Sequence, residues 1–255
     1  MTDTATPTGT TTPTTTALVT GSSSGIGLDI ARAFLASGAS VVLGGRDADR
    51  LAKAAAGLGH PERTAWVAGS IADPATGEAL VRTALDRFGG IDVLVNNAGT
   101  FAPKPFTEVT EDELDGFLTG NLKGTYLTTQ AVVRALRAQG RGGSIVNIGT
   151  VLVDHGLAGF PSSAPVVSKG GVHALTTSLA AELAADGIRV NLVSPGIIRT
   201  PLHAGSDVDS FGGLALLNRV GEVSDVSEAV LYLAGARFVT GHALRVDGGH
   251  VTGRA

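Results

Sequence analysis

The sequence predicts a single α/β domain in which a parallel sheet is covered by helices on both faces. From residue 16 onward, short runs rich in β-branched residues alternate with longer amphipathic segments. No internal linker or repeat interrupts residues 16–250. The 255 residues, with 43% hydrophobic side chains, are enough to bury one large core. We therefore expect one domain over residues 16–255, preceded by a disordered Thr-rich tail over residues 1–15.

The first part of the chain predicts three short strands with helices between them. Residues 17–19 form an apolar run typical of a buried strand, and residues 26–37 have the apolar spacing of a helix. A second apolar run at 41–43 precedes a helix that begins near Asp47, whose carboxylate suits an N-cap. Residues 65–68 predict the third strand.

The middle of the chain continues the alternation. A helix is expected over residues 74–88, with a proline in its first turn, where a missing N–H costs nothing. Residues 91–95 predict the fourth strand. A long helical stretch over 111–138 follows, and we expect interruptions near Gly120 and Gly124 because glycine weakens a helix.

The last part predicts three more strands and two helices. The strands are expected at 144–148, 188–193 and 243–246, and the helices at 165–185 and 224–234. Strands that alternate with helices imply right-handed crossovers, and therefore a doubly wound parallel sheet.

Composition excludes several classes of protein. The chain has no cysteine, which excludes a disulfide scaffold, a thiolate metal site and a cysteine nucleophile. Its net charge of −4 argues against a nucleic-acid binder. No signal sequence or membrane-spanning run is visible, and together with the missing cysteines this predicts a cytoplasmic protein. No cluster of side chains suggests a metal site. Only two tyrosines are present, Tyr126 and Tyr232.

The link between the first strand and the first helix has the composition of a phosphate-binding turn. Small side chains let the backbone approach a pyrophosphate, and the helix offers free N–H groups and the positive end of its dipole. A tight structural turn and the G-x-S-x-G nucleophile elbow of α/β-hydrolases are alternatives for this segment. The residues expected to line the phosphate site are Gly21, Ser23, Ser24, Gly25, Ile26 and Gly27.

Further motifs follow in order, and with the turn they make the chain resemble the short-chain dehydrogenase/reductase family from residue 16 to about residue 250. The resemblance implies a Rossmann-like, seven-stranded, doubly wound sheet that binds a nicotinamide dinucleotide and a small-molecule substrate. It also implies a homodimer or homotetramer. The motifs are Asn96-Asn97-Ala98-Gly99, Asn121, Gly143 to Ile148, Ser168-Lys169-Gly170-Gly171, Ile188 to Asn191, Ser194-Pro195-Gly196, Thr200-Pro201 and Val246 to Gly249.

The resemblance assigns cofactor roles to several of these residues. Lys169 is expected to hydrogen-bond the nicotinamide ribose, and Thr200 to hold the nicotinamide carboxamide. The remaining cofactor-binding residues implied by the family are Asn97, Ala98, Gly99, Pro195, Gly196 and Ile198.

The end of the second strand predicts the choice of dinucleotide. NAD-binding proteins place a carboxylate there that takes the ribose hydroxyls, and this chain has Gly45 instead. Arg46 follows and can pair with a 2′-phosphate in bidentate fashion. We therefore expect NADP(H) to be favoured over NAD(H).

The catalytic motif departs from the family pattern. Counting back from Lys169, the family's tyrosine position holds Pro165, which has no proton to donate. The family's serine position holds Thr150, whose hydroxyl can still bind a carbonyl oxygen, and Asn121 stands at the family's asparagine position. Three residues are candidates for a replacement acid. They are Lys169, Thr150 acting through a water held by Asn121, and His155 in the loop after the fifth strand.

Three functions are compatible with this pattern. The first is an oxidoreductase that transfers hydride to or from a carbonyl, an activated alkene or an imine with a replaced proton donor. The second is a catalytically silent cofactor-binding scaffold, and the third is a non-redox lyase or isomerase in the same pocket. A further interpretation is that Pro165 is a deliberate replacement of the family's tyrosine. Residues 201–220 are expected to form the substrate loop, and Arg199 before it is expected to form a surface ion pair.

Overall fold

A computed structural model describes residues 15–205 and 207–253 and confirms the predicted fold class. Its seven strands form one parallel sheet in the order β3-β2-β1-β4-β5-β6-β7. The expected tail over residues 1–15 lies almost entirely outside the described residues. The strands are β1 (Thr16–Thr20), β2 (Ser40–Gly45), β3 (Thr64–Ala68), β4 (Val93–Asn96), β5 (Gly143–Ile148), β6 (Ile188–Pro195) and β7 (Ala243–Val246).

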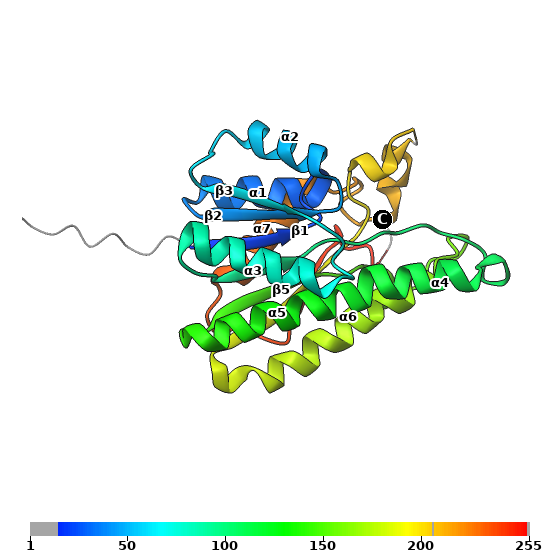
Figure 1. The fold of residues 1–255 in the computed structure, drawn as a ribbon. Coiled ribbons are helices and arrows are strands. Elements are labelled where there is room, and N and C mark those ends of the chain that lie inside the picture. Colours follow the sequence, from blue (N-terminus) through cyan, green and yellow to red (C-terminus); the bar gives the residue numbers. More distant parts are fainter. Residues whose placement is uncertain (1–14, 206, 254–255) are drawn as a thin grey trace, which may run out of the picture.

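Helices connect the strands, as Figure 1 shows. The long stretch predicted over residues 111–138 is divided by a π-helical segment, Leu118–Lys123, which contains Gly120 and ends just before Gly124. The helix predicted from residue 165 begins two residues earlier, at Ser163. The α-helices are α1 (Gly25–Ala36), α2 (Ala48–Leu58), α3 (Pro74–Phe88), α4 (Glu111–Phe117), α5 (Gly124–Gln139), α6 (Ser163–Glu182) and α7 (Val223–Gly235).

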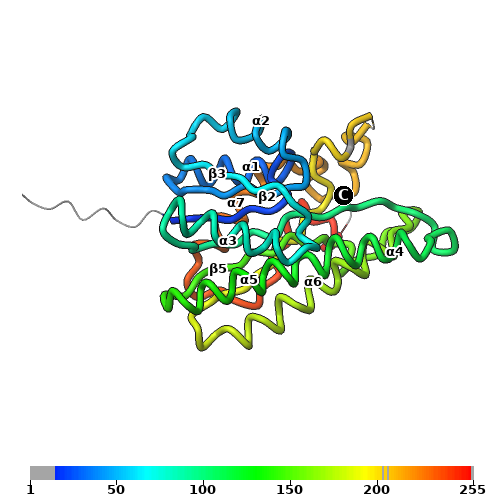
Figure 2. The backbone as a smooth tube through the Cα atoms, viewed as in Figure 1, coloured from blue at the N-terminus to red at the C-terminus, as the bar shows by residue number. Residues whose placement is uncertain are grey.

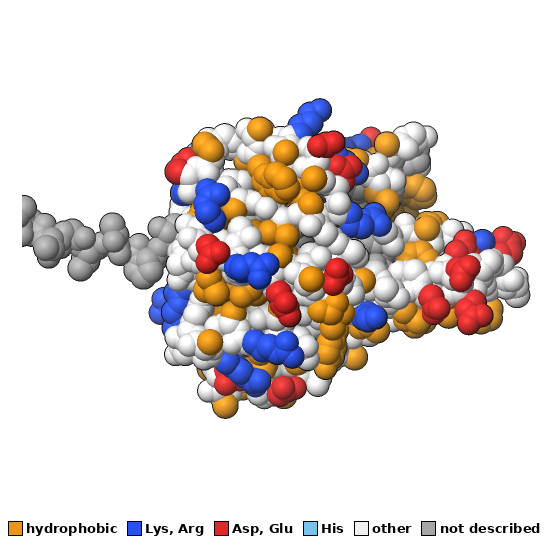
Figure 3. Space-filling model, in the orientation of Figure 1, with side chains coloured by type: hydrophobic (Ala, Val, Ile, Leu, Met, Phe, Trp, Pro, Cys, Tyr) orange, Lys and Arg blue, Asp and Glu red, His pale blue; other side chains and the backbone are white. Residues whose placement is uncertain are grey.

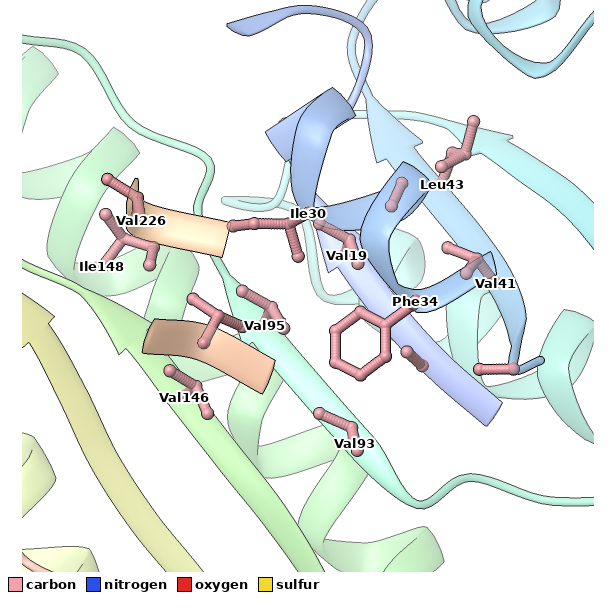
Figure 4. Close-up of a cluster of buried hydrophobic side chains, with 14 of the residues drawn as sticks. Val19, Ile30, Phe34, Val41, Leu43, Val93, Val95, Val146, Ile148 and Val226 are labelled. Atoms are coloured by element: carbon pink, nitrogen blue, oxygen red, sulfur yellow. The ribbon is translucent and has the colours of Figure 1, made fainter. Parts of the chain in front are cut away.

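Alternating strand residues supply the cores of the two faces of the sheet. Val19 and Leu43 point to one face, where they pack with side chains of α1, α2 and α7, such as Ile30 and Phe34 (Figure 4). Leu18 and the other residues of opposite parity pack with α3, α5 and α6. Successive strand side chains point to opposite faces, so strands covered on both sides are apolar through their middle, as residues 17–19 of β1 and 41–43 of β2 are.

The backbone trace in Figure 2 shows the loop before α4 and α4 itself extending beyond the body of the sheet. Figure 3 shows acidic side chains gathered at this end of the molecule. The first turn of α4 contains Glu111, Asp112 and Glu113, and carboxylates there interact favourably with the helix N-terminus. No helix within the described residues is long and apolar enough to span a bilayer.

Candidate active site

A large cleft lies at the carboxyl ends of the central strands. Strand β1 pairs with β2 on one side and β4 on the other, so the strand order reverses direction here. Such a switch point leaves a crevice between the crossovers, where ligands bind in doubly wound sheets. The cleft has a volume of about 920 Å³. Its lining combines the turn after β1, the ends of β2, β3 and β4, the α4 region and the start of α6.

The turn after β1 is built for close backbone approach. Gly21 and Gly25 have φ values of +65° and +56°, which favour glycine. The Asn97 side-chain amide donates to the carbonyl oxygens of Thr20 (3.0 Å) and Gly21 (3.1 Å), and so ties β4 to the turn. A Cβ at Gly27 would collide with both the Gly21 carbonyl and the Asn97 amide. The turn therefore fits a cradle for a pyrophosphate at the N-terminus of α1.

Gly27→Ala is expected to lower stability by roughly 1–3 kcal/mol, because the new methyl group overpacks a site with no room to relax. Cofactor affinity should fall with it. Thermal unfolding and nucleotide titration measure the two effects. Gly57→Ala is the matched control, since a Cβ there meets nothing within 4 Å inside α2 and should stabilise the helix by roughly 0.5–1 kcal/mol. A Gly27→Ala protein with wild-type stability and affinity would contradict the structure of the turn.

Lys169 is a buried lysine beside the cleft, although it does not line the cleft itself. Its Nζ atom donates to the carbonyl oxygen of Ile148, at the end of β5, over 2.7 Å. An ideal Cβ placed on Gly99, which lines the cleft, would lie 3.2 Å from this Nζ and 2.9 Å from Oδ1 of Asn121. Burial disfavours the charged amine and lowers the pKa of Lys169 to about 8. The amine therefore exchanges protons near neutral pH beside the wall of the cleft.

The Asn121 side chain is fully used in hydrogen bonds within the protein. Its Oδ1 accepts from the backbone N–H of Thr100 (2.8 Å), while Nδ2 donates to the Thr100 carbonyl (3.0 Å) and to the Ser168 hydroxyl (2.9 Å). Ser168, which the sequence indicated only through its motif, donates in turn to the carbonyl of Pro165 (2.8 Å). The amide of Asn121 therefore positions the loop after β4 against α6.

Pro165 lies in the first turn of α6, four residues before Lys169, and lines the cleft together with Ala164. A first-turn N–H has no partner within its helix, so proline is tolerated there. Ser162, the N-cap residue of α6, makes no side-chain cap, and its hydroxyl donates to the carbonyl of Phe160. The wall at residue 165 is thus apolar.

The two remaining catalytic candidates lie in different surroundings. Thr150 directly follows Gly149 at the end of β5, and its half-buried hydroxyl accepts from the N–H of Leu152 at 3.3 Å. The hydroxyl proton is still available to a ligand. His155 packs edge-on against the ring of His250, with 5.6 Å between ring centroids. Neither Thr150 nor His155 is among the residues that line the cleft.

Of the cofactor-binding residues expected after β6, Thr200 lies against the turn. Thr200 packs against Gly25, with its Cβ 3.7 Å from the position a glycine Cβ would take. Gly196, after Pro195 at the end of β6, lies against Asp247, and Ile198 is buried. These residues border the site but do not line the cleft itself.

Arg199 forms the predicted surface ion pairs. Its guanidinium contacts Asp209 in the loop over residues 201–220, and its Nε donates to Glu222 over 2.9 Å. These contacts join the loop to the start of α7, so the guanidinium of Arg199 is paired with carboxylates of the protein itself. Within the described residues, no three His, Cys, Asp or Glu side chains are grouped so as to hold a metal ion.

The fold and site match known proteins over nearly the whole chain. The crystal structure of a short-chain type dehydrogenase/reductase from Mycobacterium marinum aligns with a TM-score of 0.88 and 31% identity, covering 92% of this chain and 95% of that one. A family model described as enoyl-(acyl carrier protein) reductase matches residues 21–251. The chain belongs to the short-chain dehydrogenase/reductase family.

Curated relatives in the short-chain dehydrogenase/reductase family are dehydrogenases. The chain is 39% identical to the cis-4-hydroxycyclohexanecarboxylate dehydrogenase of Sinomonas cyclohexanicum, covering 91% of this chain and 95% of that protein. It is 34% identical to the NADP-dependent (R)-specific alcohol dehydrogenase of Lentilactobacillus kefiri, with the same coverage of 91% and 95%. The protein is therefore a member of an oxidoreductase family that uses nicotinamide cofactors. This assignment favours the dinucleotide turn over the hydrolase elbow at Ser23.

Proposed function

We propose that the protein is an NADP(H)-dependent oxidoreductase that reduces or oxidises a small carbonyl, alkene or imine substrate. The observation that carries this proposal is the cleft at the switch point. The glycine turn, Gly99 and Asn121 line this cleft, and the buried amine of Lys169 lies behind Gly99. The cofactor would supply the hydride. The turn after β1 would hold its pyrophosphate, and Lys169 and Thr200 its nicotinamide half.

The preference for NADP(H) is proposed from the end of β2. Gly45 presents no carboxylate to repel a 2′-phosphate, and the exposed Arg46 lines the cleft next to it. A bidentate guanidinium–phosphate pair is a strong, charge-assisted interaction. The relative from Lentilactobacillus kefiri is NADP-dependent by name, which supports the same choice.

Arg46→Ala is expected to weaken NADPH binding by roughly tenfold to a hundredfold, as the loss of a hydrogen bond to a charged group predicts. NADH affinity should change little, because NADH has no 2′-phosphate. Titration of the purified protein with both nucleotides checks this. Arg82→Ala, an exposed arginine on α3 outside the cleft, is the control. Equal affinity of wild type for the two nucleotides, or an unchanged preference in the Arg46 variant, would refute the assignment.

The proton donor is proposed to be Lys169. Pro165 stands where the family pattern has tyrosine and cannot donate a proton. The ammonium of Lys169, with its pKa lowered to about 8 by burial, is an acid matched to neutral pH. The Thr150 hydroxyl would bind the substrate oxygen beside it. The edge-on contact of His155 with His250 makes His155 the weaker candidate.

Assembly and location stay predictions. Exposed Tyr126 and Val167, on α5 and α6, are 51% and 59% accessible, and they support a homodimer or homotetramer in which these helices are covered. We keep the cytoplasm as the expected location.

A further inference from the structure

A second arginine borders the cleft beside Arg46. Arg50 lies in the first turn of α2 and lines the cleft together with Arg46, Asp47 and Ser24. Arg50 lies outside the glycine turn and the end of β2, so the sequence motifs did not predict it as a site residue. It reaches the site only because α2 begins at the rim of the cleft.

Two hydrogen bonds set the position of Arg50. The carboxylate of Asp47, the N-cap residue, accepts from the backbone N–H of Arg50 over 3.0 Å and so fixes the first turn of α2. From that turn, Nη2 of Arg50 donates to the hydroxyl of Ser24 over 3.3 Å. The guanidinium therefore extends from α2 to the glycine turn after β1, along the rim of the cleft.

The charge of Arg50 has no carboxylate partner in this arrangement. Among the salt bridges of the described residues, none involves Arg46 or Arg50. The Ser24 hydroxyl is neutral, and 3.3 Å is at the long end of hydrogen-bond distances. An anion that enters here can therefore take over the guanidinium N–H groups at little cost, because charged acceptors bind them more strongly.

We infer that Arg50 is the second anchor of the 2′-phosphate of NADP(H), acting with Arg46 to set cofactor specificity. The inference rests on the proposed NADP(H)-dependent function. A phosphate monoester carries about −1.5 to −2 charges at neutral pH and three acceptor oxygens. One guanidinium neutralises only part of that charge, whereas the two guanidinium groups of Arg46 and Arg50 together balance the charge of the phosphate. The phosphate replaces the Ser24 hydroxyl as the partner of Arg50.

Two small nucleotides that differ only in the 2′-phosphate test this inference without any catalytic step. Adenosine 2′,5′-bisphosphate and adenosine 5′-monophosphate are titrated into wild type, Arg50→Ala, Arg50→Lys and Lys53→Ala. Lys53 is an exposed cation on the same helix outside the cleft lining, and its loss controls for general charge. Thermal unfolding confirms that each variant is folded.

Arg50→Ala should weaken binding of the bisphosphate by roughly tenfold to a hundredfold. Binding of the monophosphate should stay close to wild type. Arg50→Lys should recover part of the loss, because lysine restores the positive charge but not the two parallel hydrogen bonds of a guanidinium. Equal weakening of both nucleotides would overturn the inference, since Arg50 would then serve the 5′-phosphate or the turn. An unchanged bisphosphate affinity would overturn it too.

The outcomes separate this inference from the proposed function. If hydride transfer from NADPH persists but Arg50 has no effect on bisphosphate binding, the inference alone fails. If Arg50 sets the bisphosphate preference in a protein that transfers no hydride to any substrate, the oxidoreductase proposal alone fails.

Discussion

Replacing Pro165 with tyrosine is expected to raise the rate of carbonyl reduction by up to roughly 10²-fold, the lower end of the usual contribution of a positioned general acid, because Lys169 already donates a proton in wild type. Pro165 lines the cleft in the first turn of α6, four residues before the buried amine of Lys169. A tyrosine there has room to project into a cleft of about 920 Å³. The nearby ammonium would favour the phenolate and bring the phenol pKa closer to neutral.

The measurement compares wild type, Pro165→Tyr and Pro165→Ala with ketones, enones and imines. The alanine variant removes the ring without adding an acid, so it should stay near the wild-type rate. A tyrosine variant no faster than the alanine variant would contradict the argument. If wild type and both variants bind cofactor and convert nothing, the scaffold function is favoured. If product forms without a change in reduced-nicotinamide absorbance, the lyase or isomerase function is favoured.

Removing the amine in Lys169→Met is expected to lower the wild-type reduction rate by roughly 10²–10⁴-fold, because both the proposed acid and a ribose contact are lost. The pH profile gives a sharper readout. Reduction needs the ammonium form, so the wild-type rate should be level below the pKa of about 8 and fall as pH rises through it. Oxidation of the corresponding alcohol needs the free amine and should show the opposite slope.

Lys169→Arg is the control for the pH profile. Arginine keeps a positive charge but does not titrate in this range, so the fall in rate near pH 8 should disappear. Methionine removes a buried charge and keeps similar bulk, so loss of folding is not expected to explain the loss of activity. A wild-type profile with no change between pH 7 and 9 would remove Lys169 as the proton donor, because its pKa of about 8 lies in that window.

Residues far apart in the sequence determine much of the site. The catalytic role of Asn121 stays a prediction, and in the structure its side chain joins Thr100 to Ser168. The contact of His155 with His250 joins the loop after β5 to the segment after β7. No local pattern encodes such pairings, because they depend on which loops the sheet brings together.

The sequence by itself determined the alternation of strands and helices, the phosphate-binding turn and the apolar residue at position 165. These features are local, since they depend on side-chain spacing, backbone conformation and the chemistry of single residues. Only the tertiary structure decided that Lys169 is buried against Ile148, with its pKa lowered, and that Arg50 reaches Ser24. Burial and charge proximity arise from elements that meet at the carboxyl edge of the sheet, so they appear only when the chain is folded.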